Sequence, residues 1–257
     1  MSDKYKLLFN DYCYILGRKA YRIQALKDFG DVKNGSIGGF VEGYHNLSTY
    51  GNSWIYDDAA AVGYSCVNDS ACLYDNAVIS DDAVVCDYAI VRGGAHVDEF
   101  AYITDDSFVL DKACISGHAV LKGECVVSGK ANILDDAVIK DSAVIRGVSI
   151  VLENAVISHN AVVEAYSIIG GHTSIAINAH IKGDNDFIVV GPFGSLAEYI
   201  TAYKDNNNNI YLSTNYFSGS VRDFYKYALD SHLLSENEFK ILKQLYHYIL
   251  LQNEKTE

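Results

Sequence analysis

The repeat that decides the fold opens with the stretch NSWIYDDAAAVGYSCVNDSACLYDNA (residues 52–77) and continues without a slip to Lys182. A small residue returns every six positions, twenty-two times from Ser53 to Ala179. Two places after each small residue comes Val, Ile or Leu, with Ala61 as the exception. A period of six fits neither an α-helix nor long sheet strands, so it predicts repeated short strands joined by corners.

The two periodic slots predict the lining of a coil. Residues two apart in a strand share a face, so the small and the aliphatic side chains both point inward. Gly or Asp mostly precedes the small slot, as at Gly51, Asp57 and Gly63, and both types tolerate the backbone of a tight corner. Three such edges close a triangular coil of eighteen residues, and the repeat makes a little over seven coils. One coil cannot bury its own interior, so the coils must stack.

This spacing resembles that of the hexapeptide-repeat proteins, and the resemblance implies a left-handed parallel β-helix. The run RIQALKDFGDVKNGSIGGFVEGYHNLS (residues 22–48), followed by GNSWIYDDA, resembles the opening of the YdcK-like proteins. That bacterial and prophage-encoded group is often labelled as acetyltransferases. The order strand, GP and GS, hairpin, FSGS and helix after residue 184 is similar to the tail of phage proteins with this opening. The resemblance therefore implies a protein of phage or prophage type.

The flanks of the repeat predict an all-β-dominated chain in three parts. Residues 1–50 form a strand-rich N-terminal cap, residues 51–183 the β-helix, and residues 184–257 a small α+β region. Turn residues and capping signals place the elements of the two flanks. We expect strands at Tyr12–Leu16, Arg22–Leu26 and Phe187–Val190, a hairpin of Ala197–Tyr203 and Ile210–Phe217 around the run DNNNN, a helix from Ser220 to about Ser231, and a second from Ser235 through Ile249.

Composition and charge predict the compartment of the protein, the state of its cysteines and the partners that it does not bind. No segment reads as a membrane span or a secretion signal, which predicts a cytoplasmic protein. Five of the six cysteines fall in the repeat without CxxC spacing, so we expect them to be reduced. The net charge is −13, and residues 51–182 hold 18 acidic and 7 basic residues. An acidic rod repels phosphates, which disfavours direct nucleic-acid binding.

Residues between the two inward slots should face outward, and stacking sorts them into three faces. Face 1 carries Trp54, Cys72, Ile90, Phe108, Val126, Val144, Val162 and His180; face 2 carries Ala60, Val78, His96, Cys114, Asn132, Ile150 and Ile168; face 3 carries Cys66, Val84, Tyr102, Val120, Val138, Val156 and Ser174. Valine also suits exposed strands by propensity alone. Face 1 is nevertheless more apolar than a soluble monomer usually leaves bare. We expect a homo-oligomer, dimer or trimer, with an interface drawn from Trp54, Ile90, Phe108, Val126, Val144 and, on face 3, Tyr102.

The sequence offers few candidates for catalytic or metal-binding residues. The resemblance implies, for an acyltransferase, a catalytic histidine in a cleft between subunits closed by a loop, yet the repeat carries no inserted loop. His96 and His118 are the candidates if the chain is a transferase using acetyl-CoA; otherwise we expect no catalytic residue and no cofactor. His118 and His172 share a column, but they lie three coils apart, roughly 14 Å, too far to hold one metal ion.

Asp69, Asp87 and Asp105 form a column of like charges on successive coils. Such a column binds a cation, costs stability at low salt, presents a DNA-like line of charge, or consists of hydrated turn residues. The favoured reading is a non-catalytic oligomeric binding or scaffold protein of phage type, which sequesters a host protein or a small signalling molecule. The alternatives are an acyl-CoA-dependent acetyltransferase and an acidic DNA-mimic inhibitor.

Overall fold

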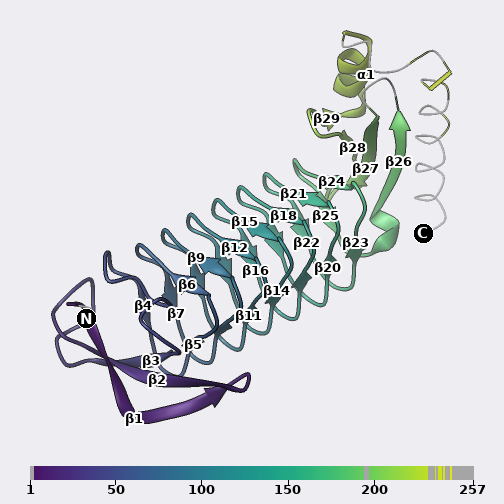
Figure 1. Cartoon of the computed structure of the whole chain (residues 1–257). Coiled ribbons are helices and arrows are strands. Elements are labelled where there is room, and N and C mark those ends of the chain that lie inside the picture. Colours follow the sequence, from purple (N-terminus) through teal and green to yellow (C-terminus); the bar gives the residue numbers. More distant parts are fainter. Residues whose placement is uncertain are drawn as a thin grey trace.

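The computed structural model describes residues 3–193 and 197–230, together with residues 235, 237, 238, 240 and 244. The chain forms a parallel β-helix of about eight turns, with antiparallel strands at both ends and a helix beside the C-terminal sheet (Figure 1). The predicted fold class is thus confirmed. No helix among the described residues is long and apolar enough to cross a membrane.

Twenty-two two-residue strands, β4 to β25, build the three faces of the rod. Face 1 consists of β4 (Trp54–Ile55), β7 (Cys72–Leu73), β10 (Ile90–Val91), β13 (Phe108–Val109), β16 (Val126–Val127), β19 (Val144–Ile145), β22 (Val162–Val163) and β25 (His180–Ile181). Face 2 consists of β5 (Ala60–Ala61), β8 (Val78–Ile79), β11 (His96–Val97), β14 (Cys114–Ile115), β17 (Asn132–Ile133), β20 (Ile150–Val151) and β23 (Ile168–Ile169). Face 3 consists of β6 (Cys66–Val67), β9 (Val84–Val85), β12 (Tyr102–Ile103), β15 (Val120–Leu121), β18 (Val138–Ile139), β21 (Val156–Ile157) and β24 (Ser174–Ile175).

The register between coils is eighteen residues, as the triangular coil predicts. Ile90, for example, pairs in parallel with Cys72 on one side and with Phe108 on the other. Every residue of the small slot from Ser53 to Ala179 is at most 2% exposed, and the aliphatic slot is fully buried. The predicted lining of the rod is therefore confirmed, and this lining is the main hydrophobic core.

The acidic residues at the corners join successive coils. Most of them have a positive φ, such as 55° at Asp105. Asp and Glu carboxylates at these corners accept a hydrogen bond from the backbone N–H eighteen residues later, as Asp105 does from Gly123 at 2.8 Å and Asp111 from Gly129 at 2.9 Å. The column of Asp69, Asp87 and Asp105 belongs to this system, because each carboxylate accepts from the amide of the next coil. The corners thus add hydrogen bonds between coils on top of the strand ladders.

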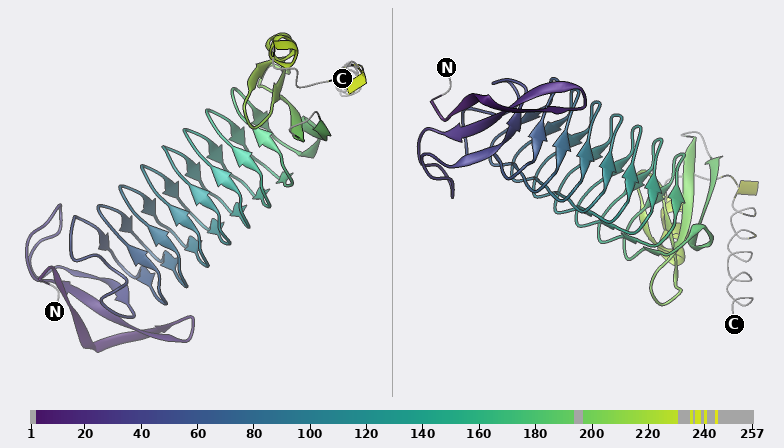
Figure 2. Two further views of the ribbon diagram at one scale, coloured as in Figure 1. Left: turned by 45° about the horizontal axis from the view of Figure 1, so that its top comes forward. Right: turned by 90° about the horizontal axis from the view of Figure 1, so that it is seen from below.

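The N-terminal cap continues the sheet of face 2. Strand β1 (Tyr5–Ile15) pairs antiparallel with β2 (Arg18–Ala25), which pairs antiparallel with β3 (Ile37–Val41). Both strands β1 and β2 are longer than predicted, and the hairpin lies alongside the first coils (Figure 2). Strand β3 pairs in parallel with β5, and Leu47 bridges Val67. The winding therefore begins before Asn52, which explains about eight turns in place of seven.

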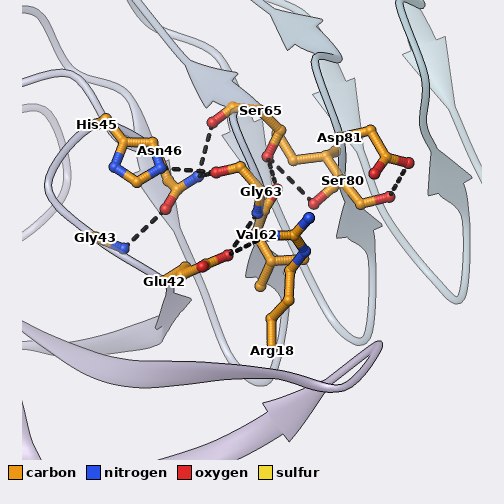
Figure 3. Close-up of polar contacts among 11 residues, drawn as sticks. Arg18, Glu42, Gly43, His45, Asn46, Val62, Gly63, Ser65, Ser80 and Asp81 are labelled. Carbon is orange, nitrogen blue, oxygen red and sulfur yellow. Dashed lines mark hydrogen bonds and ion pairs between the residues drawn. The ribbon is translucent and has the colours of Figure 1, made fainter.

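A polar network fastens the cap to the first coil (Figure 3). The Asn46 side chain donates to the carbonyl oxygens of Gly63 and Ser65 at 3.0 and 2.8 Å, and it accepts from the Gly43 N–H. Glu42 accepts from the Gly63 N–H at 2.8 Å and pairs with Arg18 at 3.4 Å. These contacts satisfy strand-edge groups that the end of the rod would otherwise expose.

The C-terminal region closes the other end of the rod. It runs from η1 (Asp184–Asp186) through β26 (Phe187–Phe193), β27 (Glu198–Lys204), β28 (Ile210–Ser213) and β29 (Ser218–Ser220) to α1 (Val221–Asp230). The predicted hairpin is confirmed, because β27 and β28 pair antiparallel, but its second strand ends at Ser213 and not at Phe217. Ser220 caps α1 by accepting from the Asp223 N–H at 3.2 Å. The second predicted helix lies mostly outside the described residues, although the Ser235 N–H donates to Glu238 at 2.7 Å.

Candidate functional site

The structure places His96 on β11 of face 2, in a small polar group. His96 Nε2 lies 3.3 Å from the Ser80 hydroxyl and 3.6 Å from the nearer carboxylate oxygen of Asp98. In a serine triad the acid holds one ring nitrogen while the other takes the serine proton. Here both neighbours meet the same nitrogen, so the group is not arranged as such a relay.

His118 and His172 occupy corners and stack on aromatic rings. The ring of His118 stacks on Phe100 with centroids 4.8 Å apart, and the ring of His172 stacks on Tyr199 at 4.5 Å. Among the described residues, no group of three His, Cys, Asp or Glu side chains could hold a metal ion. All six cysteines are free. The spacing of six is kept from β4 to β25, so no loop projects from the coils to close a cleft over His96 or His118.

Face 1 carries an apolar column that no described residue covers, but Trp54 does not belong to it. Trp54 is 1% exposed, because the cap covers it with the rings of Tyr5 and Phe29, at centroid distances of 6.3 and 5.4 Å. The proposed interface role of Trp54 is therefore corrected: it anchors the cap. At the other end of face 1, His180 Nε2 pairs with Glu164 at 2.6 Å.

The remaining column, which we call the apolar strip, crosses five successive coils. Its side chains are half-buried by their stacked neighbours and point outward from β10, β13, β16, β19 and β22. The apolar strip consists of Ile90, Phe108, Val126, Val144 and Val162. Tyr102, the face 3 candidate, lies apart from the apolar strip and is 41% exposed. A hydrogen bond with the Cys86 thiol is the chief cause that raises the pKa of Tyr102.

A cavity of about 320 Å³ lies where the last coils of face 3 meet the loop before β29. Its lining combines an ammonium, an imidazole and several hydroxyls with an apolar wall. The lining residues are Lys140, Val156, Ser158, His159, Ser174, Ala176, Ile177, Thr214, Asn215, Tyr216, Phe217 and Ser218. This volume falls within the usual range for small-molecule sites.

Sequence reasoning missed this cavity, although one residue signals it. His159 takes a corner position that Asp or Gly fills at all six preceding positions of its column, and it adopts a φ of 58°. Its Nδ1 lies 3.0 Å from the Ser158 hydroxyl and 3.8 Å from an Asp141 carboxylate oxygen. A bulky ring is uncommon at a corner with positive φ. His159 therefore interrupts the Asp and Gly pattern of its column at the position of the cavity. The loop of residues 214–218, which forms the opposite wall, carries no such signal.

Comparison with known proteins adds no family to this picture. No protein-family model matches the chain, and no curated protein is similar enough to count as a match.

Proposed function

We propose that the chain is a non-catalytic binding and scaffold protein that self-associates through the apolar strip on face 1. The resemblance of its opening and tail suggests a protein of phage or prophage type that acts in the cytoplasm. In that role a rigid rod presents its free faces to a host protein or a small signalling molecule and holds it. Such a role needs rigidity and surface, and it needs no reacting group.

One observation carries the proposal: the apolar strip crosses five coils, and nothing in the described chain covers it. The cap ends near Trp54 and Cys72, and the polar contact between His180 and Glu164 follows beyond Val162. A straight apolar column on a flat sheet face suits a second copy of the same rod, because identical faces match in length. Burial of large apolar side chains such as Phe108 supplies the free energy of association.

Two matched variants test this proposal. Val126→Glu places a charge in the middle of the apolar strip, whereas Val120→Glu places the same charge at the equivalent outward position of face 3. Both valines are half-buried and have parallel neighbours on both sides. Light scattering at micromolar concentration should give an oligomeric mass for the wild type and for Val120→Glu. It should give the monomer mass for Val126→Glu, because burying an unpaired carboxylate is costly.

Circular dichroism should show the same β-helix in both variants, which separates loss of association from unfolding. If Val126→Glu and Val120→Glu dissociated the oligomer equally, the assignment of the interface to face 1 would be wrong. A monomeric wild type would remove the self-association itself.

A further inference from the structure

We propose that the face 3 cavity binds a small organic anion, in which a phosphate or carboxylate group is joined to an apolar body. This inference gives the proposed binding role a ligand class. The site lies on a different face from the apolar strip, so either proposal can fail while the other stands.

Two nitrogen-containing side chains, those of Lys140 and His159, indicate that the ligand is an anion. Lys140 is half-buried and lines the cavity, and its ammonium forms no ion pair with any part of the chain that the structure describes. The Ser158 hydroxyl and the Asp141 carboxylate both lie beside Nδ1 of His159. Nε2 of His159 has no partner within residues 3–193 and 197–230, so it is available to a ligand oxygen. Lysine is a common partner of phosphate oxygens.

A backbone donor adds to this pair. On the preceding coil, the Asp141 carboxylate accepts from the His159 N–H at 2.9 Å. His159 has no carboxylate that could accept from the N–H of Ile177 on the next coil. The Ile177 N–H has no acceptor among the described residues. Corners that follow a glycine also lack this bond, but Ile177 lines the cavity. A ligand oxygen would take the place that a carboxylate holds elsewhere in the column.

The other lining residues offer contacts to the apolar body of the proposed ligand. Val156, Ala176 and Phe217 supply an apolar wall, and Tyr216 is 73% exposed at the rim. Several of the hydroxyls already have partners: Ser218 contacts the Tyr203 hydroxyl at 3.0 Å, and Thr214 accepts from the Tyr216 N–H at 3.2 Å. They keep the wall in place. The cavity therefore joins a cationic corner to a ring-sized apolar space, and bare inorganic phosphate would use only the corner.

Isothermal titration with four probes tests the inference on the full chain. Phenyl phosphate and benzoate combine an anion with a ring, inorganic phosphate has the anion alone, and benzyl alcohol has the ring alone. Phenyl phosphate or benzoate should bind with a Kd below about 1 mM, and the single-feature probes at least about tenfold more weakly. Whichever of phenyl phosphate and benzoate has the lower Kd shows whether the site prefers a phosphate or a carboxylate group.

The variants locate the site. Lys140→Gln should weaken binding at least about tenfold, the usual effect of losing a charged hydrogen bond. His159→Asn should also weaken it, and asparagine tolerates the positive φ of that corner. Lys122→Gln is the matched control, since Lys122 stands one coil earlier in the same column, is exposed and does not line the cavity. It should change the Kd by less than about twofold, because an exposed charge outside the site is screened by salt.

Two results would overturn the inference: no ring anion binds at about 10 mM, or Lys122→Gln and Lys140→Gln weaken binding equally, as a diffuse surface charge would. If the wild type is a monomer and still binds phenyl phosphate, the inference stands and self-association fails alone. Val126→Glu should also bind phenyl phosphate, because Val126 does not line the cavity.

Discussion

Asp87 shows what a corner residue contributes in this rod. Its φ of 56° lies in the left-handed region, which aspartate tolerates better than most residues. Its carboxylate accepts from the Thr104 hydroxyl and from the Asp105 N–H on the next coil. These two hydrogen bonds, with the Thr104 bond as the larger cause, lower the pKa of Asp87. The same side chain therefore meets a backbone demand and links two coils.

Three substitutions at Asp87 separate those contributions. Asp87→Asn keeps both the tolerance of positive φ and an acceptor, Asp87→Gly keeps only the tolerance, and Asp87→Val keeps neither. We expect the free energy of unfolding to fall in the order wild type, Asn, Gly, Val. Backbone strain alone should cost the valine variant roughly 1–2 kcal/mol. Urea unfolding measures the order, and a valine variant as stable as the glycine variant would contradict it.

The pH dependence of the Asp87 contribution follows from the lowered pKa. A carboxyl group with a lower pKa in the folded chain stabilises it above the unfolded pKa, about 3.9. That stabilisation is lost as the pH falls through the folded pKa. The advantage of the wild type over Asp87→Asn should therefore be full at pH 6 and shrink below about pH 4. An advantage that grew on acidification would show that the charged form is not the stabilised one.

At the residue scale, the sequence predicted where the corners lie but not all that they do. Gly or Asp before each small residue predicts a tight corner, because those residues accept its backbone. The bond from each carboxylate to the next coil needs the eighteen-residue register in three dimensions. The stacked aspartates are consequently explained as links between coils, a role absent from the readings of that column considered from sequence. His159 broke the corner pattern visibly, but its meaning depends on a loop more than fifty residues away.

At the scale of elements, the two end regions account for most differences from expectation. The periodic slots predicted every strand from β4 to β25, since the pattern repeats locally. The cap lacks that pattern, and its β3 nevertheless pairs in parallel with β5. That pairing depends on contacts distant in sequence, which short-range signals cannot report. Trp54 follows the outward pattern of face 1, yet the rings of Tyr5 and Phe29 cover it.

Trp54 is the chain's only tryptophan, so its fluorescence reports on the cap. A ring that is 1% exposed should emit at short wavelength and resist quenching by acrylamide. Phe29→Ala removes one covering ring and should shift the emission to longer wavelength and raise the quenching constant. Phe108→Ala, on the apolar strip, is the control and should leave both unchanged. Strong quenching in the wild type would mean that the cap does not cover Trp54.

At the scale of the whole molecule, the triangular rod follows from the sequence, and its use follows only from its surface. The inward slots are constrained by burial, so they repeat strictly and could be read without a structure. Outward residues are free to vary, and only the structure shows which of them are covered. Of the outward residues of face 1, Trp54 lies under the cap and His180 pairs with Glu164, so neither belongs to the apolar strip. The structure also brought Lys140 and His159 together with the loop before β29.

Native mass spectrometry at micromolar concentration tests the central claim, self-association along face 1, most directly. The chain has a mass of 28.3 kDa. We predict a single dominant species at two or three times that mass, which returns to the monomer mass in Val126→Glu and not in Val120→Glu. A wild type that flies only as the 28.3 kDa monomer would contradict the account.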